Sequence, residues 1–206
     1  MTSGGSISIV AWSQTSAQPR RRADAQRNIE RILDAALEAL TDDLDASMTE
    51  IARRAGVVRA TIYVHYPTRD ELLDAVTARA FSEIGEAIAA ADPQRGEPID
   101  ALRRVVAATW RKLGRYHALV AITTARDTSE EVHERHAGVL DQLLPLVRRG
   151  QHSGAFRADV PADWHLSMLI ALIHAASAEV RAGRVDDHDA EAAVTATVIG
   201  ALARPA

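Results

Sequence analysis

The first informative feature of this sequence is an absence, because none of its 206 residues is a cysteine. Disulfides, thiolate zinc sites and a cysteine nucleophile are therefore excluded. The apolar run at residues 7–12 is too short for a secretory signal or a membrane span. These absences favour a cytoplasmic protein, and we predict that it has no cofactor and no metal site.

An excess of positive charge is missing as well. The formal net charge is −4, so the whole chain lacks the basic character of many nucleic-acid-binding proteins. Residues 1–66 contain eight basic and eight acidic residues, whereas residues 67–206 contain sixteen basic and twenty acidic residues. Arg20, Arg21 and Arg22 form a compact basic cluster. Such a cluster is typical of a solvated tail, and it also fits an arm that contacts DNA.

Apolar residues make up 47% of the chain and recur at helical spacing, which predicts a folded helical core. Two capping boxes, Ser47 to Glu50 and Thr68 to Glu71, mark helix starts. Residues 1–23 are predicted to be a disordered, partly basic arm, and Asp24 is the predicted first cap. We predict an all-α protein of about nine helices, over residues 24–40, 48–55, 58–66, 68–91, 99–117, 119–126, 129–147, 162–182 and 189–203.

One stretch, AGVVRATIYVHYP at residues 55–67, has the composition of a β-strand. Three residues argue instead for two short helices that cross at a tight turn. Ala52 is small enough for close approach of the backbones, Gly56 tolerates a positive φ at the turn, and Ile62 anchors the second helix. Pro67 then ends the segment.

With Ile62 facing inward, a step of 100° per residue turns Ala60 and Val64 outward. Small and apolar side chains allow a helix to enter the DNA major groove and to contact thymine methyl groups. Arg59 can bond guanine, while the flanking side chains of Thr61, Tyr63 and His65 can bond phosphate or base edges. The alternative is a packed helical pair whose aromatic residues belong to the core.

The segments ILDAALEAL and MTEIARRAGVVRATIYVHYPTRDELLDAV resemble the DNA-binding domain of the TetR family of transcriptional regulators. This resemblance covers residues 24–76, and it implies a homodimeric repressor or activator that leaves its operator when a small molecule binds. By position, it implies operator contacts from Thr61, Tyr63 and His65, and sequence readout by Arg59 and Ala60. Phosphate contacts are implied for Thr49 and Arg69, and Arg20, Arg21 and Arg22 would form an arm that reaches the DNA backbone or the minor groove.

Val58 departs from the family pattern, in which many members have a serine or threonine at this position. Valine has no side-chain oxygen, so the second helix begins without a side-chain cap. We expect Val58 to contact sugar or methyl groups of the DNA.

Residues 24–72 are the predicted helix-turn-helix domain, and residues 73–206 are the predicted effector-binding and dimerisation domain. The helix predicted at residues 162–182 is apolar on two sides, so one side can face its own core and the other a partner. The last helix is rich in small residues. These two helices predict a homodimer that forms a four-helix bundle across a two-fold axis. A monomeric bundle is the alternative.

An effector pocket is expected between the central helices, lined mainly by apolar side chains and suited to a small apolar or amphipathic molecule. Ordinary core packing is the alternative for each candidate, and for His174 it is the preferred interpretation. His133 and His136 share one helix face and raise the alternative of a metal site, which an exposed helix start explains better. The pocket candidates are Trp110, His117, Thr124, Leu140, Leu144, Trp164, Met168 and His174.

The sequence is compatible with two classes of function. The first is a ligand-responsive transcription factor that binds double-stranded operator DNA. The second is an all-α enzyme or protein-interaction module with an incidental helix-turn-helix. The sequence has no glycine-rich phosphate loop, no HExxH motif and no GxSxG motif. We therefore predict a DNA-binding regulator rather than an enzyme.

Overall fold

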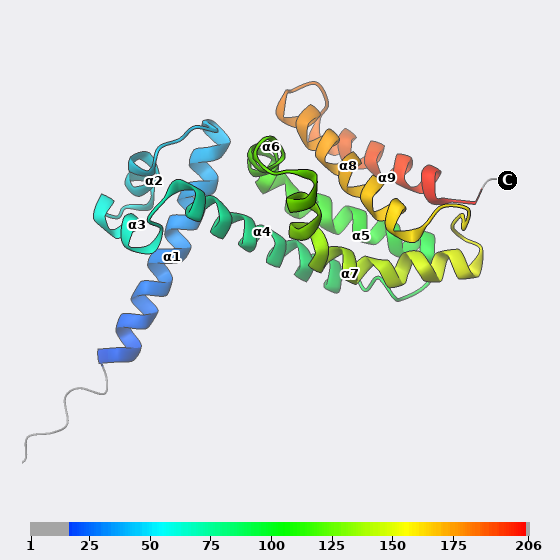
Figure 1. Cartoon of the computed structure of the whole chain (residues 1–206), viewed down its shortest axis with the longest axis horizontal. Helices are drawn as coiled ribbons and strands as arrows, with labels where there is room; N and C mark the ends of the chain where they lie inside the picture. The colour runs from blue at the N-terminus through cyan, green and yellow to red at the C-terminus, as the bar shows by residue number, and fades with distance from the viewer. Residues whose placement is uncertain (1–16, 205–206) are drawn as a thin grey trace, which may run out of the picture.

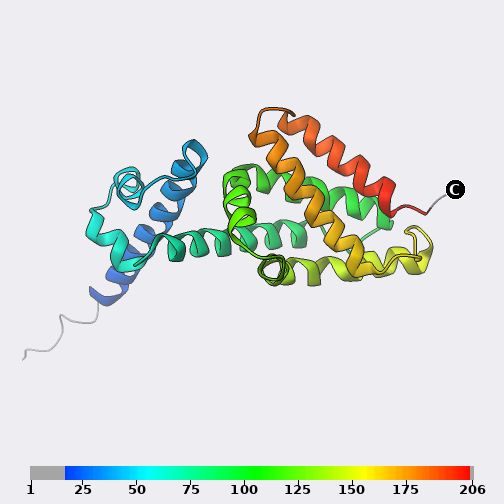
Figure 2. The same cartoon turned by 45° about the horizontal axis from the view of Figure 1, so that its top comes forward.

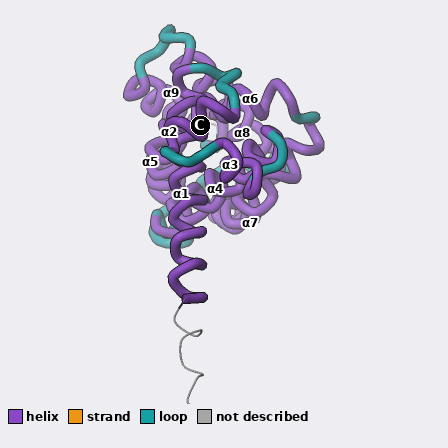
Figure 3. The backbone as a smooth tube through the Cα atoms, turned by 90° about the vertical axis from the view of Figure 1, so that its left-hand side faces the viewer, coloured by secondary structure: helices purple, strands orange, loops and turns teal. Residues whose placement is uncertain are grey.

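The structure is a computed structural model that describes the backbone of residues 17–204 and the side chains of residues 24–204. Within that range the chain forms nine α-helices and one short 3-10 helix, and no strand (Figures 1 and 3). The predicted all-α class is confirmed. The helices are α1 (Ala17–Asp42), α2 (Met48–Ala55), α3 (Arg59–His65), α4 (Arg69–Ala90), α5 (Pro98–Leu113), η1 (Gly114–Tyr116), α6 (His117–Arg126), α7 (Ser129–Ser153), α8 (Ala162–Arg181) and α9 (Asp187–Leu202).

The first helix begins earlier than the sequence predicts. Asp24 is not its cap, because α1 starts at Ala17 and projects beyond the other helices (Figure 3). Pro19 lies in the first turn, where its missing N–H removes no helical hydrogen bond, and the arginines that follow favour a helix. The predicted disorder is therefore wrong for residues 17–23, while residues 1–16 lie outside the described part of the chain.

Helices α1 to α3 form a small domain at one end of the molecule (Figure 1). Its core contains Ile32, Leu40, Ile51 and Ile62, none of which exposes more than 1% of its surface. The hydroxyl of Ser47 accepts a hydrogen bond from the backbone N–H of Glu50 at 3.2 Å, as predicted for the start of α2. Only this half of the capping box forms, because the Glu50 carboxylate pairs with two arginines instead.

Helix α4 leaves the small domain and runs into the bundle formed by α5 to α9 (Figure 2). Near its start, Leu72 and Val76 are buried; near its end, Ile84 and Ile88 are buried in the bundle. The predicted domain boundary at residue 72 therefore falls inside a continuous helix. One helix contributes core residues to both halves of the molecule.

Two details of the helix ends in the bundle differ from the predicted ones. The helix predicted to reach residue 117 ends at Leu113, and a 3-10 turn leads into α6 at His117. The cap of α7 is Thr128 rather than Ser129, and it forms a complete capping box with Glu131. Both residues carry the required oxygen, so sequence chemistry alone does not distinguish them.

The C-terminal end of α7 depends on close packing at Gly150. This residue is buried, and a Cβ atom built on it would lie 2.0 Å from the Cδ2 atom of Phe156. Phe156 itself exposes only 1% of its surface, so its ring has little space to move. Glycine is required here for room rather than for backbone conformation.

We expect Gly150→Ala to destabilise the protein by about 2 kcal/mol, because the new methyl group overpacks a filled core. Gly138→Ala is the matched control in the same helix, since a Cβ atom there meets no atom within 4 Å. The control should gain up to about 1 kcal/mol from helix propensity. Thermal and urea unfolding of both variants measure the difference, and equal stabilities would contradict the packing argument.

Candidate nucleic-acid interface and ligand cavity

A tight turn joins α2 to α3 and fixes the angle between them. Gly56 has φ +63° and ψ +34°, a left-handed conformation that favours glycine. Its N–H donates to the carbonyl of Arg53 at 3.2 Å, and the N–H of Val57 donates to the carbonyl of Ala52 at 3.0 Å. These two bonds form a Schellman motif. Arg31 of α1 also donates to the carbonyl of Ala55 at 2.6 Å, which holds the turn against the domain.

The predicted orientation of α3 is confirmed. Ile62 is fully buried, whereas Val64 is 77% exposed and Ala60 is also exposed. Thr61 and His65 are half-buried on the flanks of the helix. The exposed face of α3 is therefore one of small and apolar side chains bordered by hydrogen-bonding groups.

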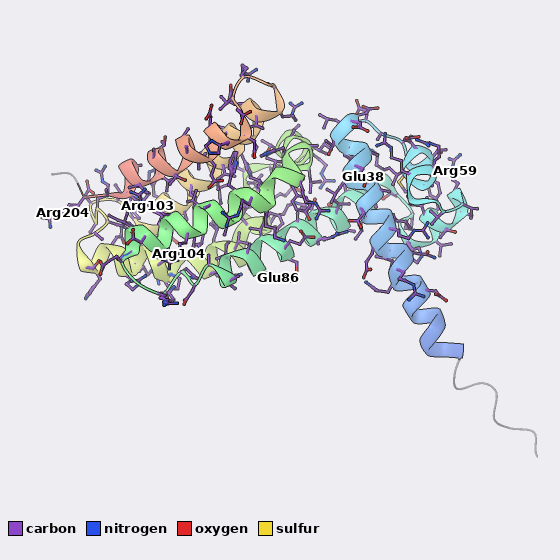
Figure 4. All side chains as sticks on the ribbon, turned by 180° about the vertical axis from the view of Figure 1, so that it is seen from behind. Glu38, Arg59, Glu86, Arg103, Arg104 and Arg204 are labelled. Atoms are coloured by element: carbon purple, nitrogen blue, oxygen red, sulfur yellow. The ribbon has the colours of Figure 1, made fainter. Side chains whose placement is uncertain are left out.

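Arg59 and Tyr63 form a pair one helical turn apart on this surface. The Arg59 guanidinium donates to the Tyr63 hydroxyl at 3.4 Å, and its Cζ atom lies 5.3 Å from the centre of the tyrosine ring. Figure 4 shows Arg59 at the outer end of the small domain, away from the α5–α9 bundle. The pair places a cation and a hydroxyl together beside the exposed face of α3.

Val58 occupies the cap position of α3 without capping it. Its side chain makes no cap hydrogen bond, and it is 70% exposed. The absence of a side-chain cap is thus confirmed, and the exposed side chain fits the predicted contact with sugar or methyl groups. The backbone N–H of Thr61 donates to the carbonyl of Val58 at 2.8 Å, so the first turn of α3 closes without a side-chain cap.

The remaining predicted DNA contacts have different surroundings. Thr49 is exposed at the start of α2. Arg69 is half-buried, and its guanidinium donates to the carbonyl of Leu44 at 2.5 Å, so it holds the loop between α1 and α2. Arg20, Arg21 and Arg22 belong to α1, but their side chains lie outside the described part of the structure. The DNA contacts of these residues stay predictions.

Carboxylates near the candidate interface are paired with arginines. The Glu50 carboxylate accepts hydrogen bonds from Arg53 at 2.7 Å and from Arg54 at 2.8 Å. The bonds from Arg53 and then Arg54 lower the pKa of Glu50 to about 2. Arg54 also pairs with Asp42 at 2.7 Å. These pairs reduce the negative potential near α2, where an acidic side chain would repel phosphate.

A chamber of about 60 Å³ lies inside the bundle, between α4, α5, α7 and α8. Its walls are almost entirely apolar, as the sequence predicts for an effector pocket. The chamber is smaller than the 300–1,000 Å³ of typical ligand pockets. Its lining residues are Phe81, Ile84, Ile88, Val105, Val106, Thr109, His136, Val139, Leu140, Leu143, Leu169, Ile170, Ile173 and His174.

Only two of the eight predicted pocket residues, Leu140 and His174, line this chamber. His117 and Thr124 line a separate outer hollow of about 260 Å³, which His174 also borders. The other four do not line the chamber. Trp110 is a buried core residue, Leu144 and Met168 pack against the core, and Trp164 is 66% exposed.

Two histidines and a phenylalanine form an aromatic wall in the chamber. The ring centres of Phe81 and His136 lie 4.8 Å apart in an edge-to-face arrangement, and those of His136 and His174 lie 5.2 Å apart. Burial, aided by the neighbouring His136, lowers the pKa of His174 to about 4. Burial also lowers the pKa of His136. Both rings are therefore uncharged at neutral pH.

His136 differs most from the sequence-based interpretation. The sequence pairs it with His133 at an exposed helix start, yet only His133 is exposed. The Nδ1 atom of His136 lies 2.6 Å from the carbonyl oxygen of Val132, one helical turn earlier. In the sequence, His136 lies three residues before Val139, and this spacing places both side chains on the inner face of α7. That spacing is the sequence feature that could have identified His136 as a chamber residue.

The surface of α8 and α9 shows the predicted division into two sides. Leu166 and Leu169 of α8 and Val194 and Val198 of α9 are buried in the bundle. The opposite side carries small exposed residues and one exposed indole, namely Ala171, Ala175 and Ala178 with Trp164 on α8, and Ala193, Ala196, Thr197 and Gly200 on α9.

None of the helices between residues 17 and 204 combines the length and apolarity that a membrane-spanning helix requires.

Comparison with known proteins bears on the function. Residues 32–76 match the family model described as bacterial regulatory proteins, tetR family. This match covers α2 and α3 with the adjoining parts of α1 and α4.

Curated relatives extend the similarity beyond this domain. The chain is 29% identical over 160 residues to the HTH-type transcriptional regulator NfxB of Pseudomonas aeruginosa, covering 75% of this chain and 83% of the relative. It is 44% identical over 82 residues to the HTH-type transcriptional repressor LfrR of Mycolicibacterium smegmatis, covering 39% of this chain and 43% of the relative. Both names describe transcriptional regulators rather than enzymes.

A solved structure supports the same assignment. The crystal structure of the TetR-like regulator LfrR from Mycobacterium smegmatis in complex with proflavine matches with a TM-score of 0.67 and 26% identity. The match covers 87% of this chain and 99% of that chain. Together with the matched domain and the geometry of α2 and α3, these similarities support a DNA-binding transcriptional regulator of the TetR family.

Proposed function

We propose that this protein is a homodimeric repressor that leaves its operator when a small, mainly apolar molecule enters the bundle. The observation that carries the proposal is the course of α4. Its first half packs in the small domain, and Phe81, Ile84 and Ile88 from its second half line the chamber. A molecule that displaces this wall therefore acts on the helix that supports the DNA-binding surface.

The exposed face of α3 supports a role as the recognition helix. Ala60 and Val64 suit close contact with the major groove and its thymine methyl groups, and Arg59 suits guanine. Tyr63 and Thr49 suit phosphate oxygens, which position a protein on DNA without reading its sequence. Arg20, Arg21 and Arg22 are proposed as an additional backbone contact.

A dimer is proposed because helix-turn-helix regulators read two half-sites about one helical turn apart. The exposed small residues of α8 and α9 allow a second copy to approach closely. Ala171 and Ala175 lie one helical turn apart on α8, and Ala193 and Ala196 offer a similar strip on α9. A pair of such helices from each copy would form the four-helix interface.

The small volume of the chamber is the basis for the proposed release of the protein from its operator. A free volume of about 60 Å³ is far below that of a drug-sized pocket, so a ligand must move the chamber walls to enter. A ligand that prefers the displaced walls shifts the population toward a form with wrongly spaced recognition helices. Such coupling is typically worth ~1–3 kcal/mol. The proflavine complex of LfrR supports a ligand-responsive role for this fold.

The experiment that tests the proposal is a titration of the protein with DNA from upstream of its own gene and with scrambled DNA of equal length, over a series of salt concentrations. Operator binding should be at least ~1,000-fold tighter than binding to the scrambled DNA. It should also weaken with salt, with a slope that grows by about one for each phosphate contact. Equal affinities for the two DNAs throughout the salt series would refute the proposal.

Two substitutions separate base contacts from phosphate contacts. Arg59→Ala should relax the preference for one base pair, because the guanidinium is proposed to read guanine. Tyr63→Phe should weaken binding by ~1 kcal/mol, and similarly for all operator variants, because it removes one hydroxyl. The phenylalanine ring retains the contact with Arg59.

Binding assays with a set of single-base operator variants distinguish these outcomes. A uniform loss for Arg59→Ala would contradict base readout, and unchanged affinity for Tyr63→Phe would argue against a phosphate contact.

A further inference from the structure

The polar groups of the chamber are few, and they define what a ligand must offer. Of the fourteen lining residues, only Thr109, His136 and His174 have polar side chains, and none is acidic, lysine or arginine. An ion that entered would lose its hydration without gaining an opposite charge, which is costly. The chamber therefore favours an uncharged molecule.

The hydrogen bond made by His136 fixes which of its nitrogens can bind a ligand. The carbonyl oxygen of Val132 can only accept, so the Nδ1 atom 2.6 Å away carries the hydrogen. In an uncharged imidazole the other nitrogen, Nε2, is then an acceptor. It has no hydrogen-bond partner among the described residues. His136 thus offers an acceptor to a ligand that carries a donor.

Thr109 supplies the complementary group. Its Oγ1 atom is buried and has no hydrogen-bond partner among the described residues. A buried hydroxyl without a partner is unfavourable, and a ligand that bonds it recovers this free energy. The hydroxyl hydrogen can be donated to a ligand oxygen. A ligand hydroxyl is the simplest group that both donates to a histidine and accepts from a threonine.

The aromatic wall indicates the shape of the ligand. Phe81, His136 and His174 come from three different helices, with neighbouring ring centres 4.8 and 5.2 Å apart. A planar ring can pack against such a wall edge to face or in an offset stack. The other lining residues are aliphatic, and they accommodate an apolar body.

We propose that the chamber binds an uncharged aromatic compound with a hydroxyl group, a molecule of the phenol or naphthol class. The hydroxyl donates to Nε2 of His136 and accepts from Oγ1 of Thr109, while the ring packs against Phe81 and His174. This inference rests on the proposed function, because it names the ligand class of the proposed effector site.

The proposed route into the chamber passes His174. This residue lines the chamber and also the outer hollow of about 260 Å³ between α6 and α8. Rotation of its ring would join the two spaces and provide room for a bicyclic ring. Besides His174, the titratable groups of the outer hollow are His117 and Arg181, and neither of these two lines the chamber.

Three probes with the same ring system test the proposal, and their binding to the full-length protein is measured by fluorescence titration and calorimetry. Naphthol carries the donor, methoxynaphthalene has an oxygen that cannot donate, and naphthoate is an anion. Naphthol should bind about tenfold more tightly than methoxynaphthalene, the usual effect of one net hydrogen bond. Naphthoate should bind more weakly than either.

Variants locate the hydroxyl of the probe. His136→Phe keeps an aromatic ring and removes the acceptor, and Thr109→Val keeps the shape and removes the hydroxyl. Each should reduce the affinity for naphthol by about tenfold. His136→Phe should leave the affinity for methoxynaphthalene unchanged, whereas Thr109→Val should reduce it, because the ether oxygen still accepts from the threonine hydroxyl. Thr123→Val is the matched control, because this hydroxyl donates to the carbonyls of Leu119 and Val120 and the residue lines neither the chamber nor the outer hollow. It should bind all three probes as the unaltered protein does.

Several outcomes would overturn the ligand class. These are equal binding of naphthol and methoxynaphthalene, tightest binding of naphthoate, no binding of any probe, or no effect of either chamber variant. Operator binding by the same sample without probe is measured in parallel. If the operator binds and the probes do not discriminate, only the ligand class fails. If the operator does not bind, the proposed repressor function fails, whatever the probes do.

Discussion

The packing of α4 against both halves of the molecule is the constraint on which the rest of the structure depends. Leu72 and Val76 are buried with the residues that hold α3 in place, and Ile84 and Ile88 form part of the chamber wall. These residues lie on one unbroken helix of 22 residues without proline. A helix of this kind has no proline kink, and in the proposed mechanism it would carry a displacement at the chamber toward the proposed DNA-binding surface.

Two groups of ion pairs surround this helix where the domains meet. Arg79 of α4 joins Asp34 of α1 at 2.8 Å, and Asp74 of α4 joins Arg126 of α6 at 2.8 Å and Arg135 of α7 at 3.1 Å. All of these groups are partly exposed, so each pair contributes little to stability. They connect α4 to α1, α6 and α7 at the domain boundary.

The sequence predicts the DNA-binding half well because its determinants are local. Gly56 marks a left-handed turn, Ser47 marks a helix start, and Ile62 fixes the direction of α3 by burial alone. The chamber could not be predicted as well, because its walls come from four helices whose relative rotation depends on packing. Trp164 resembles a core residue in sequence and is exposed, whereas His136 resembles a surface residue and faces the chamber.

The most direct test of the coupling through α4 fills the chamber without a ligand. Val139 of α7 lines the chamber, so Val139→Trp adds an indole ring to a free volume of about 60 Å³ and presses on α4. Ala137→Trp adds the same ring at an exposed position of the same helix. With folding verified by circular dichroism, operator affinity should fall about tenfold for Val139→Trp and stay unchanged for Ala137→Trp. A folded Val139→Trp protein that binds its operator as tightly as the unaltered protein would contradict the account.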